Sequence, residues 1–273
     1  MKQTIGFIGG GNMASSLIGG LINGGVVAPD NIFVFEPGAE KAQALKVQFG
    51  INIASSNEQL VETSSVVVIA VKPQVLKTVL SPLSSSFKAT SPLIVSIAAG
   101  ITANSIEQWL DGQFSIVRVM PNTPALVGQG ASGLYANTHV NTEQRDVAST
   151  LMNAVGDSAW VEKEQDIDSI TALSGSGPAY FMLFIQSLID AATKAGLDAD
   201  TAKKLAVKTA IGSAELINSS DLSLTTLIDN VTSPGGTTEQ ALLSFNNAGL
   251  SSTVEDAFNA AKVRSEQLAK ELG

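Results

Sequence analysis

The chain opens on a short apolar run that leads directly into a glycine-rich loop and then into a helical pattern. In this segment, Ile5-Gly6-Phe7-Ile8-Gly9-Gly10-Gly11-Asn12-Met13-Ala14, the spacing G-x-G-x-x-A falls on Gly9, Gly11 and Ala14. The first glycine permits a tight turn, the second lets a pyrophosphate approach the backbone, and a small third residue lets the helix pack on the strand. The segment therefore predicts a dinucleotide-binding strand–loop–helix unit whose free helix-start amides hold phosphates. An ordinary glycine-rich turn is the alternative.

Short β-branched apolar runs recur along the first part of the chain and alternate with helical patterns. Because these runs are apolar throughout, we expect parallel strands covered on both faces by helices. The expected strands are Thr4–Ile8, Ile32–Phe35, Val66–Val71, Leu93–Ala98 and Ile116–Val119, with later pieces at Gly133–Tyr135 and Ala159–Val161. The expected helices include Met13–Asn23, Glu40–Gln48, Gln74–Ser81 and Thr142–Val155. The pattern predicts an α/β fold with an N-terminal Rossmann-type, doubly wound parallel sheet.

The strand signals stop after about residue 164, and the rest of the chain shows helical patterns. The expected helices are Asp166–Leu173, Pro178–Lys194, Asp200–Asn218, Leu224–Asp229, Thr238–Asn247 and Val254–Leu272. Asp200 and Ser223 are expected N-caps, and Gly196 and Gly249 are expected helix stops. We therefore expect a NAD(P)-binding Rossmann domain over residues 1–164 and an all-helical domain over residues 165–273.

One expected helix is apolar nearly all round. From Ala179 to Ile189 its polar side chains are Gln186, Ser187 and, in part, Tyr180. Such a helix is buried on all sides, which a small helical domain can hardly achieve alone. The pattern favours a helix in a subunit interface, and the central helix of a monomeric bundle is the alternative.

Composition excludes several classes of function. The net charge of -9 and pI of about 4.6 argue against nucleic acid or an anionic membrane as a partner. With no cysteine and one histidine, His139, disulfides, thiolate nucleophiles and the common metal sites are not expected. The N-terminus enters a strand pattern directly, and no apolar run approaches the roughly 20 residues of a membrane span. We expect a cytoplasmic protein without a membrane partner or a metal.

The second expected strand ends at Phe35-Glu36-Pro37-Gly38. Glu36 follows the glycine loop by about 20 residues, where an acid accepts the ribose hydroxyls of NAD. The same carboxylate repels the 2′-phosphate of NADP, and Lys41 either offsets that repulsion or is simply solvated. These residues leave NAD and NADP equally open.

Four further motifs occur in order along the chain. They are Ala70-Val71-Lys72-Pro73-Gln74, Val119-Met120-Pro121-Asn122-Thr123-Pro124, Leu173-Ser174-Gly175-Ser176-Gly177-Pro178-Ala179-Tyr180 and Ser233-Pro234-Gly235-Gly236-Thr237-Thr238. Together with the glycine loop they resemble the pyrroline-5-carboxylate reductase family over essentially the full length. The resemblance implies a Rossmann domain, a helical domain that forms homodimers and binds substrate, and dimers assembled into a larger ring such as a decamer. It also implies reduction of the small molecule 1-pyrroline-5-carboxylate to L-proline with NADPH, or with NADH because of Glu36.

The residues can be tested against that chemistry. A protonated cyclic imine is already electrophilic, so the site must orient the ring, hold its carboxylate and stabilise the nitrogen. Two expected helix starts could hold a carboxylate with free amides. In one, Pro178 takes the first helical position after Ser176 or Gly177 as cap; in the other, Thr237 and Gln240 have capping-box spacing. Without the resemblance, two ordinary capped helices would be the preferred interpretation.

The resemblance assigns roles residue by residue. The substrate contacts it implies are Ser176, Gly177, Ser233, Gly235, Gly236, Thr237 and Thr238. Thr238 is the expected catalytic residue, as hydrogen-bond partner of the ring nitrogen and candidate proton donor. The expected cofactor contacts are Ile8, Gly9, Gly10, Gly11, Asn12, Met13, Glu36, Asn57, Ala70, Val71, Lys72, Pro73, Ala98, Ala99, Pro121 and Asn122.

Other residues have simpler interpretations. For Lys72 the alternative is a surface lysine before a helix. Arg118 lies within a strand pattern and favours a structural ion pair, and His139 is expected to be a solvent-exposed bystander. Trp109 and Trp160 are expected to pack.

Two alternatives remain for the function. A β-hydroxyacid dehydrogenase relative would need a catalytic lysine on a helix of the second domain near a glycine-rich segment. The lysines there are Lys194, Lys203, Lys204 and Lys208, on polar helix faces that lack such a segment. A non-catalytic NAD(P)-binding sensor would have no need of two exposed helix starts facing the crevice.

Overall fold

The computed structural model describes residues 3–273, and these form two compact units. The first contains the chain up to Ser176 together with Ala261–Gly273, and the second contains Gly177–Ala260. The chain passes between the units twice, and each passage lies inside a helix. The compact units thus divide after Ser176, whereas the sequence places the domain boundary after residue 164.

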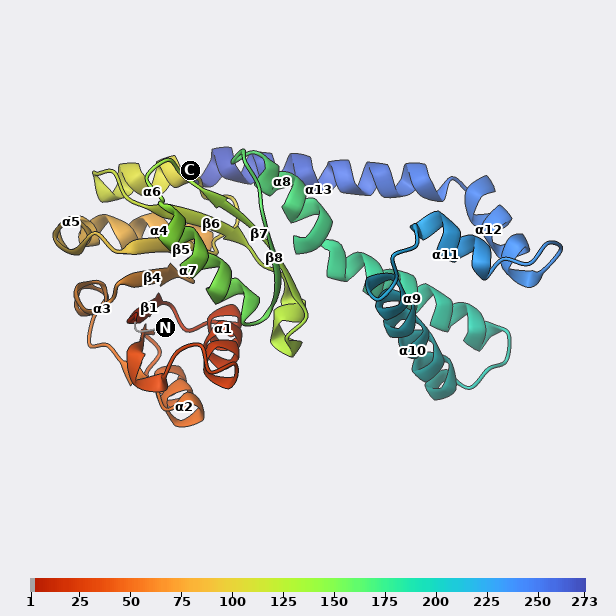
Figure 1. The fold of residues 1–273 in the computed structure, drawn as a ribbon, viewed down its shortest axis with the longest axis horizontal. Helices are drawn as coiled ribbons and strands as arrows, with labels where there is room; N and C mark the ends of the chain where they lie inside the picture. Colours follow the sequence, from red (N-terminus) through yellow and green to blue (C-terminus); the bar gives the residue numbers. More distant parts are fainter. Residues whose placement is uncertain (1–2) are drawn as a thin grey trace. The chain divides into compact units, whose positions relative to one another are not determined.

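A single sheet forms the centre of the first unit (Figure 1). Its strands are β1 (Ile5–Ile8), β2 (Ile32–Phe35), β3 (Asn52–Ile53), β4 (Val66–Ile69), β5 (Leu93–Ser96), β6 (Ile116–Met120), β7 (Gly130–Ala136) and β8 (Gly156–Trp160). Their order is β3-β2-β1-β4-β5-β6-β7-β8, and every neighbouring pair is parallel except β6 and β7. The predicted strands are confirmed to within a few residues at their ends. The two-residue β3 was not predicted.

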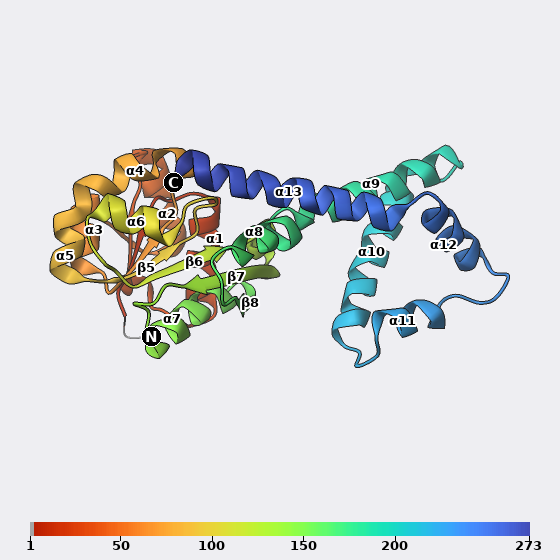
Figure 2. The same ribbon diagram turned by 90° about the horizontal axis from the view of Figure 1, so that it is seen from above.

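Helices cover both faces of this sheet, as Figure 2 shows from above. One core contains Val66 and Val68 of β4 with residues of α1 (Asn12–Asn23), α2 (Ala39–Phe49) and α7 (Thr142–Asn153). The other contains Val67 and Ile69 with residues of α3 (Asn57–Thr63), α4 (Pro73–Leu80), α5 (Ser84–Thr90) and α6 (Ala103–Leu110). Successive residues of one strand thus enter opposite cores, which explains the continuously apolar strands. The predicted doubly wound sheet is confirmed; α3, α5 and α6 were not among the expected helices.

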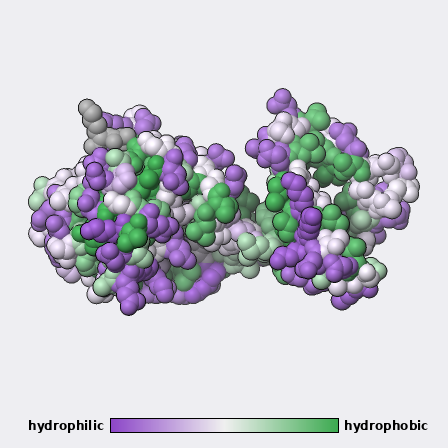
Figure 3. Space-filling view, turned by 90° about the horizontal axis from the view of Figure 1, so that it is seen from below, coloured by the Kyte–Doolittle hydropathy of each residue, from purple (hydrophilic) through white to green (hydrophobic). Residues whose placement is uncertain are grey.

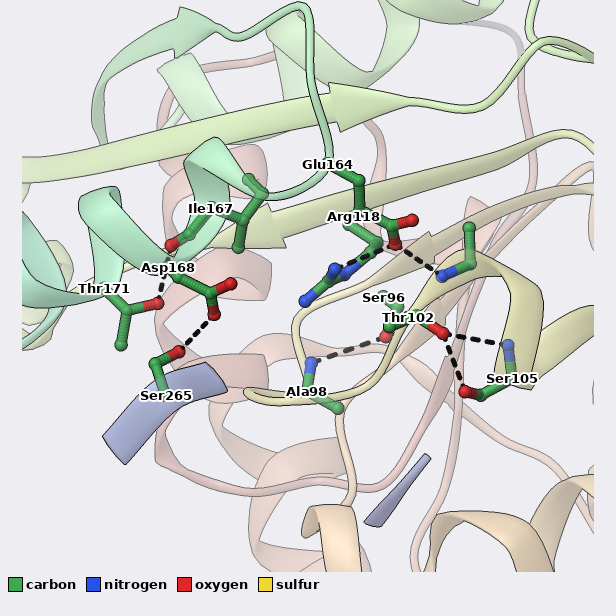
Figure 4. A network of polar contacts seen from close by, with 11 residues as sticks. Ser96, Ala98, Thr102, Ser105, Arg118, Glu164, Ile167, Asp168, Thr171 and Ser265 are labelled. Carbon is green, nitrogen blue, oxygen red and sulfur yellow. Dashed lines mark hydrogen bonds and ion pairs between the residues drawn. The ribbon is translucent and has the colours of Figure 1, made fainter. Parts of the chain in front are cut away.

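Two separate sets of polar contacts fix β6 and the helices by which the chain leaves and re-enters the first unit (Figure 4). Arg118 of β6 is buried, and its Nη1 lies 2.8 Å from Glu164 Oε1, which also accepts from the Ala103 amide at 2.7 Å. Asp168 of α8 (Asp166–Ile170) accepts from the Ser265 hydroxyl of α13 (Leu250–Leu272) at 2.6 Å. The ion pair predicted for Arg118 is confirmed.

The helix after residue 165 is not interrupted at the Ser-Gly-Ser-Gly motif. Helix α8 continues through a π-helical turn, Thr171–Gly175, into α9 (Gly177–Lys194). The expected break between Leu173 and Pro178 is therefore wrong. The resulting helix, Asp166–Lys194, is long and apolar enough by length and composition to cross a membrane, which is weak evidence. The sequence pattern predicts two shorter helices in this segment, so a helix of this length was not expected.

The second unit is helical throughout. After α9 it contains α10 (Ala199–Asn218), α11 (Leu224–Asn230), α12 (Thr237–Asn247) and the first part of α13. Ser223 caps α11 as predicted, but Asp198 rather than Asp200 caps α10, with its carboxylate accepting from the Thr201 amide. Gly196 and Gly249 have φ of +98° and +75°, and each lies just after a helix end, as expected.

Helix α9 exposes its apolar side chains. Phe181, Met182 and Leu183 are 73%, 64% and 70% exposed, so α9 is not the central helix of a monomeric bundle. Within the second unit, the described residues bury only Gly177 and Ala202. Hydrophobic residues gather on the surface of this unit in Figure 3. Apolar surface of this extent marks an interaction site.

Candidate cofactor and substrate site

The glycine loop between β1 and α1 has the geometry that a close ligand needs. Gly9 has φ of +97°, and a Cβ there would lie 2.8 Å from the Ala70 carbonyl, so no other residue fits easily. Gly11 is different: its φ is ordinary, and the nearest atom to a built Cβ is the Ala70 oxygen at 4.0 Å. Among residues 3–273 no atom crowds this position, so the backbone at Gly11 is open to close approach of a ligand.

Helix α1 begins beside that opening. Its N-cap residue is Gly11, and no side chain caps the helix. The first amides of a helix have no partner inside it and carry the positive end of the helix dipole. Ala14 of its first turn is completely buried and allows close packing on the sheet. This start is suited to hold a pyrophosphate.

Glu36 lies at the end of β2, next to the loop. Its Oε2 accepts from the Gly10 amide at 3.0 Å and lies 3.3 Å from Lys41 Nζ, and its Oε1 accepts from the Gly38 amide at 3.2 Å. Burial alone raises the pKa of Glu36, but the two amides and Lys41 outweigh burial and hold the pKa below its ordinary value of 4.5. Glu36 is therefore an anion at neutral pH.

These elements enclose a pocket of about 410 Å³. Nine residues predicted as cofactor contacts line it: Ile8, Gly9, Gly10, Gly11, Glu36, Asn57, Ala70, Val71 and Lys72. Asn57 Oδ1 is buried and has no hydrogen-bond partner within residues 3–273. A buried acceptor of this kind is costly unless a ligand supplies the donor. The pocket lies where strand order reverses between β1 and β4, which is the usual nucleotide position. These residues fit a dinucleotide.

The remaining predicted cofactor residues lie at the same edge of the sheet, outside the pocket lining. Asn12 and Met13 begin α1, Pro73 begins α4, Ala98 and Ala99 follow β5, and Pro121 and Asn122 follow β6. The carboxyl ends of parallel strands meet at this edge. Lys72 is exposed and lines the pocket, so it is a surface lysine and a pocket residue at once.

The first predicted carboxylate site is not a helix start. Ser176 follows the π turn with helical backbone angles, and its amide donates to the Thr171 carbonyl at 2.8 Å. The free amides expected there are absent because the helix continues from α8 into α9. Ser176 itself is half-buried.

The second predicted site is a helix start, but its cap differs from the expected one. Gly236, not Thr237, is the N-cap residue, because the Ser233–Gly236 turn ends there with the Gly236 amide donating to the Ser233 carbonyl at 2.9 Å. No side chain caps α12, and Glu239 Oε2 accepts from the Gly235 amide at 2.8 Å. Half-buried Thr238 lies in this first turn, among amides that remain free to bind an anion.

Several pocket residues were missed or misjudged. Phe35, Pro37, Val75 and Val79 also line the pocket, and their apolar character gave no signal. Lys41 lines it as well and pairs with Glu36, whereas the sequence favoured a solvated lysine. Gly38 directly precedes α2 as its N-cap residue, and its amide donates to the same Glu36 carboxylate.

The residues expected to be bystanders have structural partners. His139 is exposed, with Nε2 3.6 Å from a carboxylate oxygen of Glu107. Trp109 is buried in the core, while Trp160 donates to the Ser149 hydroxyl and packs under the Arg145 guanidinium. None of the three lines the pocket.

Comparison with known proteins identifies the family. A family model described as pyrroline-5-carboxylate reductase dimerisation matches residues 164–268, and one described as NADP oxidoreductase, coenzyme F420-dependent, matches residues 4–100. A pyrroline-5-carboxylate reductase of Pseudomonas aeruginosa is 49% identical over 98% of both chains. The structure of one from Coxiella burnetii has a TM-score of 0.94 at 40% identity, over 98% of this chain and 99% of that one. A Plasmodium falciparum pyrroline carboxylate reductase with NADP bound has a TM-score of 0.86 at 35% identity, over 98% of both chains.

More distant structures share the fold alone. A 3-hydroxyisobutyrate dehydrogenase of Mycobacterium tuberculosis is 16% identical, with a TM-score of 0.51 over 73% of this chain and 68% of that one. The alternative of a β-hydroxyacid dehydrogenase therefore gains no support beyond architecture. Because relatives of up to 49% identity align over nearly its full length, the chain belongs to the pyrroline-5-carboxylate reductase family of NAD(P)H-dependent oxidoreductases.

Proposed function

We propose that this chain reduces 1-pyrroline-5-carboxylate to L-proline, the last step of proline synthesis. The observation that carries the proposal is a dinucleotide pocket at the switch point of the sheet, in a chain that aligns over its full length with reductases of this name. A bound reduced nicotinamide would supply the hydride for the imine carbon, and the imine nitrogen would take a proton to become the secondary amine of proline.

The first unit supplies the cofactor contacts in this proposal. The free amides at the start of α1 hold the pyrophosphate, because Gly11 leaves room for it. Glu36 and Asn57 contact the adenosine half, where the Asn57 oxygen gains the donor that it lacks. Residues 70–73, 98–99 and 121–122, at the ends of β4, β5 and β6, border the nicotinamide half.

The substrate is held by hydroxyls and amides rather than by titrating side chains. We assign the substrate carboxylate to the amides and hydroxyls of the α12 start, with Ser176, Gly177, Ser233, Gly235, Gly236 and Thr237 as substrate contacts. The Thr238 hydroxyl contacts the ring nitrogen and holds or supplies its proton. Such a site orients an already electrophilic imine and needs no dedicated base.

The preferred cofactor is proposed to be NADPH, with NADH as the alternative. The match to an NADP oxidoreductase model and the similarity to a reductase with NADP bound support NADPH. The anionic Glu36 opposes the 2′-phosphate, and Lys41 beside it offsets part of that opposition.

We further propose a homodimer formed through the second unit, dimers assembled into a ring such as a decamer, and a cytoplasmic location. The dimerisation model over residues 164–268 and the exposed apolar face of α9 support the dimer.

One assay tests the reaction. NADPH oxidation is followed with 1-pyrroline-5-carboxylate and with no substrate, and NADP⁺ reduction is followed with a 3-hydroxyisobutyrate-type acid. We expect turnover only with the imine, and stoichiometric formation of proline. Silence with the imine and turnover of the hydroxy acid would favour a β-hydroxyacid dehydrogenase. Binding of the nucleotide with no turnover of either would favour a sensor.

A further inference from the structure

A proline lies inside the continuous helix that joins the two units. In a regular helix the amide of residue 178 donates to the carbonyl of residue 174, but Pro178 has no N–H. The Ser174 carbonyl therefore lacks the amide donor that a regular helix would place at position 178. Ser174 is half-buried, so water does not fully replace that partner, and an unpaired buried carbonyl is costly.

Asn122, at the end of β6, supplies the missing donor. Its Nδ2 donates to the Ser174 carbonyl at 3.0 Å, and its Oδ1 accepts from the Ala131 amide at 2.9 Å. One partner is an acceptor and the other a donor, which fixes the orientation of the carboxamide. Asn122 is 8% exposed. Its side chain is thus engaged within the protein, unlike that of Asn57.

A second contact joins the same two motifs. Gly175 lies against Met120, and a Cβ at position 175 would overlap the Met120 methyl group. The π turn between Thr171 and Gly175 is closed by the Ser176 amide, which donates to the Thr171 carbonyl. Two residues from the end of β6 therefore hold the turn that directly precedes Ser176. Widened turns of this kind often occur at functional sites.

We propose that Asn122 is a positioning residue, which replaces the N–H that Pro178 lacks and so fixes the π turn and the place of Ser176 at the substrate. Its side chain then acts on the substrate through the helix, and only its backbone remains for the cofactor. The inference rests on the proposed function for the identity of the substrate. The contacts that Asn122 and Met120 make with the π turn do not depend on that function.

Hydrogen exchange on the full-length protein without substrate tests whether Asn122 stabilises the π turn. In Asn122→Ala we expect amides 173–177 to exchange at least about tenfold faster than in the wild type, because the Ser174 carbonyl loses its donor. Asn122→Asp keeps the size and the acceptor for Ala131, loses the donor and adds a negative charge beside the Ser174 carbonyl, so it should show at least the same change. Asn141→Ala is the matched control, because Asn141 caps α7 and does not contact the turn.

Steady-state kinetics test whether the position of Ser176 that Asn122 maintains affects substrate binding. We expect Asn122→Ala to raise KM for 1-pyrroline-5-carboxylate about tenfold, while the dissociation constant of NADPH changes less than about twofold. Adding Pro178→Ala restores an N–H at position 178, so the double variant should recover most of the loss in KM. Pro178→Ala alone is the reference, because removing a proline from a helix also stabilises it in general, and a specific rescue must exceed that effect.

Three outcomes would contradict the proposal. Unchanged exchange of residues 173–177 in both Asn122 variants, or equal loss in Asn141→Ala, overturns the proposal. So does a KM that Pro178→Ala fails to restore. If the wild-type protein does not reduce the imine at all, the proposed function fails, and the exchange result still decides the role of Asn122.

Discussion

Glu36 accepts from the Gly10 and Gly38 amides and lies beside Lys41, so one carboxylate both completes the glycine loop and faces the nucleotide pocket. Replacement by serine removes the negative charge and leaves Lys41 free to meet a 2′-phosphate. We expect Glu36→Ser to raise the preference for NADPH over NADH about tenfold, on the order of one charge interaction near a protein surface. The measurement is kcat/KM with each cofactor at fixed salt.

Glu40→Ser is the matched control for this change. Glu40 is exposed in the first turn of α2, and it does not line the pocket. It alters the same net charge, so long-range effects appear in both variants. An equal shift in both would show that Glu36 does not face the ribose.

Thr238 is half-buried in the uncapped first turn of α12. We expect Thr238→Ala to lower kcat for the imine by about tenfold to a hundredfold, the range of a lost transition-state hydrogen bond to a charged group. The dissociation constant of NADPH should not change. Thr225→Ala, on α11 in the same unit, serves as control. Wild-type turnover in Thr238→Ala would remove Thr238 from the site.

At the scale of residues, the sequence predicted which residues line the nucleotide pocket better than it predicted the hydrogen bonds and ion pairs that those residues make. Gly9, Gly11 and Glu36 follow a spacing that local backbone geometry imposes, so nine of the expected cofactor residues lie in one pocket. The pairing of Lys41 with Glu36 depends on how the chain turns at Gly38, which spacing alone does not show. The cap of α12 was misplaced by one residue for a similar reason, because glycine caps without a side chain.

At the scale of elements, strands with a continuous apolar run of four or more residues were predictable, whereas the shortest strand and the proline-containing helix were not. The two-residue β3 is held by its neighbour β2 rather than by its own pattern. Ser174-Gly175-Ser176-Gly177-Pro178 has the composition of a loop, yet it is helical. Its compensating donor, Asn122, lies far away in the sequence, so no local pattern could reveal the continuity.

The Arg118–Glu164 pair holds β6 to the segment that begins α8. Arg118 is 7% and Glu164 21% exposed in their side chains, so removal of one partner leaves a poorly solvated charge. We expect Glu164→Ala to lower the free energy of unfolding by about 3 kcal/mol. The measurement is urea unfolding followed by circular dichroism.

The exposed pair Lys88–Asp111 provides the comparison. Its side chains are 45% and 88% exposed, and its nitrogen and oxygen lie 2.6 Å apart. We expect Asp111→Ala to cost less than about 1 kcal/mol, because water solvates the remaining lysine. A cost in Glu164→Ala as small as in Asp111→Ala would show that the buried pair is not an anchor.

At the scale of the whole molecule, the second unit exposes many large apolar side chains. Phe184 and Phe245 pack together at 5.9 Å between ring centroids, but most large apolar side chains of α9 and α10 face outward. Burying these side chains against a partner would contribute about 25 cal/mol per Å² of apolar area removed from water. The unit therefore depends on a partner surface, and a second copy of the chain supplies one in the proposed dimer.

The dimer can be tested with two matched variants. Leu183 on α9 is 70% exposed and Val47 on α2 is 76% exposed, so an aspartate costs little in a free monomer at either position. In a dimer that buries α9, Leu183→Asp places an unpaired charge in the interface. We expect Leu183→Asp to shift the protein to monomer or to unfolded chain in sedimentation at micromolar concentration. Val47→Asp should sediment as the wild type.

The wild-type melting temperature should also rise with protein concentration, because association stabilises the folded state. An intact dimer in Leu183→Asp would show that α9 lies outside the interface.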